Sequence, residues 1–93
     1  MSKLKPNIEL VIAKKKNEGF KIELNGKKVK CSQTHLAEKL NITKQQFSLW
    51  VNGRSFPRLE KAFELAHLLD VKVDELYTFI PEKRNMLDSM KDL

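Results

Sequence analysis

The segment from Ser32 to Gly53 constrains the fold more than any other part of the chain, because its pattern predicts two short helices joined by a tight turn. Leu36, Ala37 and Leu40 have the spacing of a buried stripe on the first helix. The next residue, Asn41, is of a type that tolerates the left-handed conformation in which helices often end. The chain is therefore expected to turn sharply after Leu40.

A second helix is predicted to begin at about Lys44, because Thr43 and Gln46 have the spacing of a capping box. Gly53 ends it. The side chains expected to be buried are Phe47, Trp50 and Val51. Those expected to face outward are Lys44, Gln45, Ser48, Leu49 and Asn52. Two short helices at a steep angle, the second with a polar outer face, are the arrangement that presents a helix to the major groove of DNA.

The segment resembles the Cro-like phage-repressor family of helix-turn-helix domains, also called the xenobiotic-response-element type. The residues that carry the resemblance are Gln33, Leu36-Ala37, Leu40, Ile42-Thr43, Phe47, Trp50, Asn52-Gly53 and Pro57. Leu59 to Tyr77 is similar to the last two helices of the family, so the resemblance covers roughly Ser32 to Phe79. It implies an all-α, five-helix, lambda-repressor-like DNA-binding domain.

The resemblance also implies which residues meet double-stranded DNA. The positions that approach base edges are Lys44, Gln45, Ser48 and Leu49, and the phosphate-binding positions are Gln33 and Asn52. Two interpretations of Gln46 stay open: it caps the helix, or it contacts DNA. Arg54, in the loop that follows, is interpreted as a phosphate clamp. Ser32 and Thr43, which start the two helices, are further candidates for contact with the DNA backbone.

A β-hairpin at about residues 20–31 is predicted between the first two helices, where the family has only a few residues. Asn25-Gly26 is the strongest short signal for a two-residue hairpin turn. In the register that this turn sets, Lys21 faces Lys30, Glu23 faces Lys28, and the apolar side chains share the other side of the hairpin. The expected apolar residues are Phe20, Ile22, Leu24, Val29 and Cys31. Two interpretations of Lys21, Lys28 and Lys30 stay open: they contact the DNA backbone, or they keep an exposed strand edge soluble.

The whole formal net charge of +6 lies in residues 1–31, which contain nine lysines and three glutamates. The remainder holds nine basic and nine acidic residues. A basic segment suits a polyanion, because each neutralised phosphate releases counterions. The alternative for Lys14-Lys15-Lys16 is the ordinary solvated face of a helix.

The other predicted elements complete one domain over residues 1–80, with a tail at 81–93. A first helix is expected from Pro6 to Gly19, with an apolar stripe formed by Leu4, Ile8, Val11 and Ile12. The buried stripe of the fourth helix is predicted as Leu59, Ala62, Phe63, Ala66 and Leu69. Asp70 stands where the family often has glycine, so a less strained corner is expected there. A fifth helix is predicted over Val73 to Ile80.

A homodimer is expected, because one recognition helix seldom reaches specific affinity alone and a pseudo-palindromic site has two halves. The candidate dimer surface comprises Tyr77, Phe79, Ile80, Met86, Leu87 and Met90, so the tail at 81–93 is a candidate dimerisation helix. The alternative is a tail that packs on its own domain.

The favoured function is that of a sequence-specific transcriptional regulator. It is expected to be a repressor in a phage or mobile element and to act in the cytoplasm. The alternative is an antitoxin-type module that binds a toxin protein and its own promoter. No catalytic constellation, cofactor motif or Gly-rich phosphate loop is recognisable, so an enzyme is not expected. Cys31, His35 and His67 do not have the spacing of a metal site. No apolar run is long enough to cross a membrane.

Overall fold

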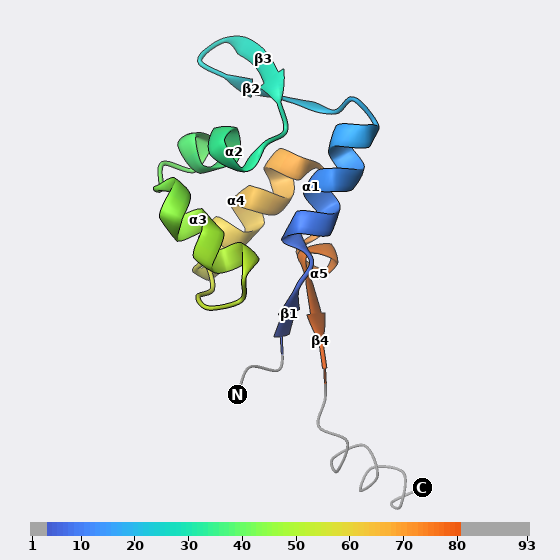
Figure 1. Ribbon diagram of the computed structural model, residues 1–93, viewed down its shortest axis with the longest axis vertical. Coiled ribbons are helices and arrows are strands. Elements are labelled where there is room, and N and C mark those ends of the chain that lie inside the picture. Colours follow the sequence, from blue (N-terminus) through green and yellow to red (C-terminus); the bar gives the residue numbers. More distant parts are fainter. Residues whose placement is uncertain (1–3, 81–93) are drawn as a thin grey trace, which may run out of the picture.

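The computed structural model describes residues 4–80 of the chain. The elements in chain order are β1 (Leu4–Pro6), α1 (Ile8–Asn17), β2 (Lys21–Leu24), β3 (Lys27–Lys30), α2 (Gln33–Lys39), α3 (Lys44–Val51), α4 (Leu59–Leu69), α5 (Val73–Leu76) and β4 (Tyr77–Phe79). The helices pack against one another in the middle, while the two pairs of strands lie at opposite ends of the long axis (Figure 1). No helix within residues 4–80 is both long and apolar enough to cross a bilayer.

The predicted number of helices is confirmed, but the all-α class is only partly right. Two antiparallel pairs of strands accompany the five helices that the structure describes. One pair is the predicted hairpin. Its four described pairs, from Lys21 opposite Lys30 to Leu24 opposite Lys27, have the predicted register. The turn residues Asn25 and Gly26 both have positive φ, as a type I′ turn requires.

The second pair of strands corrects the predicted ends of the first and fifth helices. Leu4, expected on α1, instead pairs with Phe79, and Pro6 pairs with Tyr77. Asn7 extends this pairing, since its backbone N–H donates to the Leu76 carbonyl at 2.8 Å and its side-chain amide donates to Thr78 Oγ1 at 2.7 Å.

Helix α5 ends four residues before the predicted boundary at Ile80. The residues from Tyr77 to Ile80 are aromatic or β-branched, and such residues fit a strand better than a helix. Ile80 also precedes Pro81, and a proline disfavours helical backbone in the residue before it.

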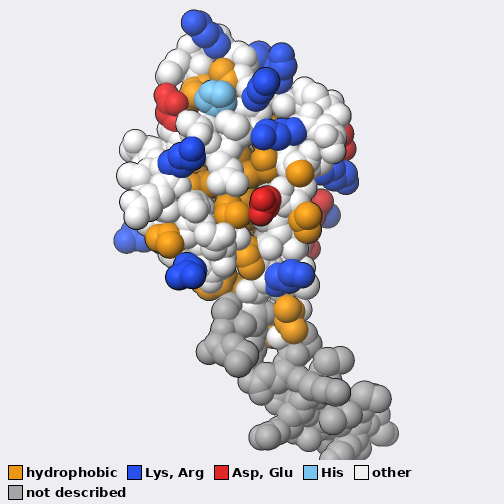
Figure 2. Space-filling model, in the orientation of Figure 1, with side chains coloured by type: hydrophobic (Ala, Val, Ile, Leu, Met, Phe, Trp, Pro, Cys, Tyr) orange, Lys and Arg blue, Asp and Glu red, His pale blue; other side chains and the backbone are white. Residues whose placement is uncertain are grey.

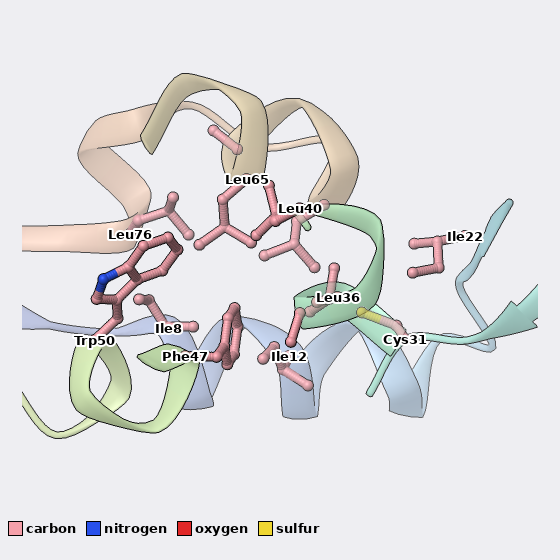
Figure 3. Close-up of a cluster of buried hydrophobic side chains, with 13 residues drawn as sticks. Ile8, Ile12, Ile22, Cys31, Leu36, Leu40, Phe47, Trp50, Leu65 and Leu76 are labelled. Carbon is pink, nitrogen blue, oxygen red and sulfur yellow. The ribbon is translucent and has the colours of Figure 1, made fainter. Parts of the chain in front are cut away.

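One apolar cluster joins the hairpin, α1 and the helix-turn-helix to α4 and α5 (Figure 3). Its buried members are Ile8, Ile12, Ile22, Cys31, Leu36, Ala37, Leu40, Phe47, Trp50, Leu65, Ala66, Leu69 and Leu76. Phe47 and Trp50 are buried, with ring centroids 5.9 Å apart. Their assignment to the core is therefore confirmed. Val51 is half-buried at the margin of the same cluster.

The predicted buried stripe of α4 is partly wrong. Ala62, Ala66 and Leu69 are buried, but Leu59 is 73% exposed and Phe63 is 58% exposed. Leu65, which the predicted stripe omits, is completely buried. The helix is therefore rotated so that Phe63 points away from the apolar cluster.

The corner after α4 is left-handed, which corrects the expectation of a relaxed turn at Asp70. Asp70 has φ 56° and ψ 47°. Its N–H donates to the His67 carbonyl, and the N–H of Val71 donates to the Ala66 carbonyl at 2.9 Å. This pair of bonds is the Schellman ending of a helix, which usually places glycine at the left-handed position.

We predict that Asp70→Gly raises the free energy of unfolding by about 0.5–1 kcal/mol. Glycine avoids most of the steric cost of the left-handed conformation, although its unfolded chain has more entropy to lose. Asp70→Val should lower the free energy of unfolding by about 1–2 kcal/mol, since a β-branched residue fits this conformation poorly. Urea denaturation measures both changes, and Asp70→Asn serves as the near-neutral control. A Gly variant less stable than the Asn variant would contradict the prediction.

Candidate nucleic-acid interface

The turn between α2 and α3 is fixed by backbone hydrogen bonds around Asn41. Asn41 has φ 60°. Its N–H donates to the Glu38 carbonyl at 3.1 Å, while the N–H of Ile42 donates to the Ala37 carbonyl at 3.0 Å. These bonds complete a Schellman motif, so the predicted left-handed helix end is confirmed. The chain changes direction at this turn, so α3 runs at an angle to α2 (Figure 1).

Thr43 caps α3, as predicted, because its Oγ1 accepts the N–H of Gln46 at 3.0 Å. The reciprocal half of a capping box is replaced by another contact. The Gln46 side-chain amide reaches the loop after α3 and donates to Ser55 Oγ at 3.4 Å. Gln46 therefore links α3 to this loop and is half-buried rather than exposed like Lys44 and Gln45.

The outer side of α3 carries most of the predicted base-reading residues. Lys44 and Gln45 are exposed in its first turn, and Asn52 is exposed at its C-cap. Ser48 and Leu49 are half-buried between them. These positions share one face of the helix because they recur at intervals of three and four residues. Phe47 and Trp50 on the opposite side hold this face outward (Figure 3).

The end of α3 is held as firmly as its start. Gly53 has φ 76°, and a Cβ added there would lie 3.3 Å from the ring carbons Cγ and Cδ of Pro6. A positive φ and the close approach of β1 therefore both favour glycine. The N–H of Arg54 donates to the Leu49 carbonyl at 3.0 Å. The Arg54 side chain is exposed beside the end of α3.

The start of α2 is joined to the hairpin by His35, a role that the sequence did not reveal. Ser32 is the predicted cap and accepts the N–H of His35 at 3.2 Å, with half-buried Gln33 following it as the first helical residue. His35 Nδ1 lies 3.0 Å from the Lys30 carbonyl oxygen and 3.0 Å from Ser32 Oγ. A carbonyl only accepts hydrogen bonds, so this contact assigns the proton to Nδ1. The ring thus fixes the end of β3 against the first turn of α2.

Lys61 supports the turn from the other side. Its Nζ donates to the Leu40 carbonyl at 2.8 Å and lies 3.4 Å from Glu64 Oε1. The ammonium group therefore occupies the C-terminal end of α2, where unpaired carbonyls favour a cation. No local signal predicts this contact, because Lys61 lies 21 positions away from Leu40 in the sequence.

The hairpin carries several exposed lysines. Lys21, Lys28 and Lys30 are all exposed, and their strands pair in the predicted register. Figure 2 shows Lys and Arg side chains over much of the visible face, most densely in the half that carries the hairpin in Figure 1. The hairpin that carries these candidate backbone contacts is joined to α2 through Lys30 and His35.

Cys31 is completely buried where the hairpin meets α2. Burial raises the pKa of the Cys31 thiol, and the nearby Lys16 and Lys15 only partly oppose this shift. A thiol with a raised pKa is largely neutral, and the thiolate is the reactive form. Cys31 therefore acts as a small apolar core residue.

The turn, its caps and the outward polar face define a helix-turn-helix DNA-binding domain. Residues 27–76, more than half of the chain, match a family model described as helix-turn-helix. The chain belongs to this family, which is of the Cro/C1 type. No individual curated protein matches the chain significantly. Membership gives the general function, that of a DNA-binding transcriptional regulator.

We predict that Thr43→Ala lowers the free energy of unfolding by about 1 kcal/mol, because the N–H of Gln46 loses its acceptor at the start of α3. Thr43→Ser keeps a hydroxyl at the cap and should retain most of the stability. Thermal unfolding without DNA compares the two variants. If both variants lose stability equally, the Thr43 methyl group rather than the cap is the important feature.

Proposed function

We propose that this protein is a sequence-specific repressor whose helix α3 reads an operator in the major groove. The observation that carries the proposal is the outward face of α3, on which Lys44 and Gln45 are exposed. Within residues 4–80, neither side chain has a hydrogen-bonding partner or an ion pair. Both therefore keep their donors and acceptors available for base edges.

The residue types on this face match distinct base edges. A lysine ammonium donates to guanine O6 and N7, and a glutamine amide binds adenine N6 and N7 with both ends. Ser48 pairs with either type of base edge, whereas Leu49 offers apolar contact, most naturally to a thymine methyl group. The proposed operator half-site is accordingly mixed in sequence.

Phosphate contacts are proposed to flank the reading face. Gln33 starts α2, Asn52 caps the end of α3, and Arg54 follows in the loop. Ser32 and Thr43 each hold a helix cap through their side-chain oxygen. Such contacts would set the register of α3 on the duplex without reading its sequence.

We predict that Gln45→Ala weakens binding to the selected operator by about 1–3 kcal/mol and relaxes the preference at one base pair. Operators are first selected from random DNA, and affinities are then measured by fluorescence anisotropy at one fixed salt concentration. Asn17→Ala, at the exposed end of α1, is the matched control and should leave affinity unchanged. Equal losses on operator and random DNA would argue against base reading by Gln45.

The proposed repressor acts as a homodimer, and an apolar groove supports this part of the proposal. The groove has a volume of about 910 Å³ and lies between β1, the loop after α3, α4 and β4. It contains exposed Phe63, Leu59 and Phe79. Contiguous apolar surface of this kind on a small domain marks an interaction site.

A second copy of the chain suits this groove for two reasons. Lys72 and Asp74 both line it, so a two-fold axis can bring Lys72 of one copy close to Asp74 of the other. The groove also includes Tyr77 and Phe79 of the expected dimer surface. Ile80, the last described residue, is exposed. The other expected members, Met86, Leu87 and Met90, lie outside the described residues.

We predict that Phe63→Ser halves the mass in solution and weakens operator binding without unfolding the domain, because Phe63 is exposed in the single chain. Light scattering and anisotropy measure the two effects. Leu10→Ser removes another exposed apolar side chain, outside the groove, and should leave both unchanged. Truncation after Pro81 separately tests the tail. A truncated chain that keeps the dimer mass would place the whole interface in the groove, and a Phe63→Ser dimer would place it elsewhere.

The same groove also favours a second candidate function, an antitoxin-type module with a toxin protein as its partner. A wild-type chain that is monomeric in solution, and that covers Phe63 only when a toxin from a neighbouring reading frame is co-expressed, would support this alternative. A wild-type dimer that becomes a monomer when Phe63 is changed to Ser would support the repressor.

A further inference from the structure

A small hollow at the base of the hairpin is surrounded by lysines from three different elements. It is formed by Lys16, Gly19, Phe20, Lys21, Lys30 and Cys31, and its volume is about 320 Å³. Lys16 lies in the last turn of α1, Lys21 begins β2, and Lys30 ends β3. None of the lining residues is acidic. We call this feature the lysine hollow.

The charge in the lysine hollow is not neutralised by the surrounding protein. Lys21 and Lys30 face each other directly across the two strands, an arrangement of like charges that is unfavourable. The next polar pair along the hairpin, Glu23 and Lys28, has opposite charges. Among residues 4–80, no carboxylate lies within ion-pair distance of Lys16, Lys21 or Lys30. An anion in the hollow would relieve the repulsion.

The walls of the hollow strengthen its attraction for an anion. The half-buried Phe20 ring forms an apolar part of the wall. Charges beside a poorly polarisable wall interact more strongly than charges surrounded by water. Lys15 is placed differently, since its Nζ lies 4.9 Å from the centre of the Phe20 ring. Lys15 thus adds positive potential close to the hollow without lining it.

The lysine hollow is also held in a fixed position beside the DNA-reading unit. The Lys30 carbonyl oxygen accepts the N–H of Ser32 at 2.9 Å and lies 3.0 Å from His35 Nδ1. Lys30 is therefore joined to the first turn of α2, next to Gln33 at the proposed phosphate contact. Successive phosphates of one DNA strand are separated by about 3.4 Å along the helix axis. A duplex held at Gln33 thus presents further phosphates on both sides of that contact.

We propose that the lysine hollow binds a phosphate group of the DNA backbone, extending the footprint of the helix-turn-helix beyond α2. This inference rests on the proposed DNA-reading function. The contact supplies affinity without sequence preference, because a phosphate is the same at every step of the duplex. The hairpin is in this respect an added backbone clamp.

The test is a variant with Lys21→Gln and Lys30→Gln, compared with a control that carries Lys5→Gln and Lys14→Gln. Both variants lose the same formal charge at exposed positions. The control residues do not line the hollow, and Lys14 lies on the side of α1 nearly opposite Lys16. The first variant removes a like-charge pair, so its thermal stability should not fall. A loss of binding therefore cannot be attributed to unfolding.

The expected result is a weaker affinity for operator and random duplexes by the same factor. The slope of log K against log salt concentration should also become shallower by about 1, as for one lost phosphate contact. The control should shift the slope by clearly less. An unchanged slope, or a slope equal to that of the control, would overturn the proposal.

A second measurement distinguishes backbone phosphate from a free phosphate. Thermal unfolding of the wild type and the hollow variant is followed in inorganic phosphate and in chloride of equal ionic strength, without DNA. Stabilisation by phosphate that the variant lacks, together with an unchanged DNA salt slope, would assign the hollow to a free anion and overturn the backbone contact. A changed slope supports the backbone contact.

The two proposals can also fail separately. If Gln45→Ala still relaxes base preference while the hollow variant keeps the wild-type slope, the reading face stands and the lysine hollow is wrong. If the hollow variant loses slope while Gln45→Ala changes operator and random DNA equally, the protein binds phosphate at the hollow and the assignment of Gln45 is wrong.

Discussion

The direction of the chain throughout this domain depends on left-handed residues at helix ends. The helices α1, α2, α3 and α4 are followed by Gly19, Asn41, Gly53 and Asp70, each with a φ between 56° and 76°. At each end the next N–H bonds back to a carbonyl in the last turn, for example Phe20 to Lys15 and Ile42 to Ala37. These bonds pair backbone groups that would otherwise remain unsatisfied at the helix ends. They also reverse the chain within two residues, so that short helices can pack around one small core.

The position of the reading face follows from this constraint together with the core. Asn41 sets the angle between α2 and α3, while Phe47 and Trp50 fix the rotation of α3 about its own axis. The Lys61 ammonium at the Leu40 carbonyl then joins α4 to the same turn. Because angle, rotation and support are fixed by separate contacts, the exposed outer residues Lys44 and Gln45 are not needed for any hydrogen bond or ion pair within residues 4–80. Their side chains are therefore free to vary with the DNA sequence that is read, without loss of the fold.

The features that sequence reasoning predicted are those whose causes lie within a few residues. The Asn25-Gly26 turn sets its own register, and the Thr43 cap and the turn at Asn41 each depend on one local hydrogen-bonding pattern. The errors arise where distant segments decide the structure. Leu4 pairs with Phe79, and Lys61 meets Leu40, although neither pair is close in the sequence. Phe63 has the spacing of a core residue yet faces the groove, because Leu65 fills the core position. Base and phosphate contacts belong to a complex with DNA, so the sequence alone yields them only as expectations.

The distribution of charge separates two properties that DNA-binding proteins often combine in one helix. The net charge of +6 precedes α2, whereas the remaining residues balance to zero. In the proposed complex, long-range attraction to a polyanion would thus arise mainly from α1 and the hairpin, and base preference from α3. The Lys30 carbonyl, held by Ser32 and His35, keeps the two parts in a fixed relation. If the proposed contacts hold, a change in these lysines is expected to alter how strongly all DNA is bound and how steeply binding depends on salt. A change on α3 is then expected to alter which DNA is preferred. In the proposed complex, the hairpin would therefore provide a way to adjust affinity while α3 stays the same.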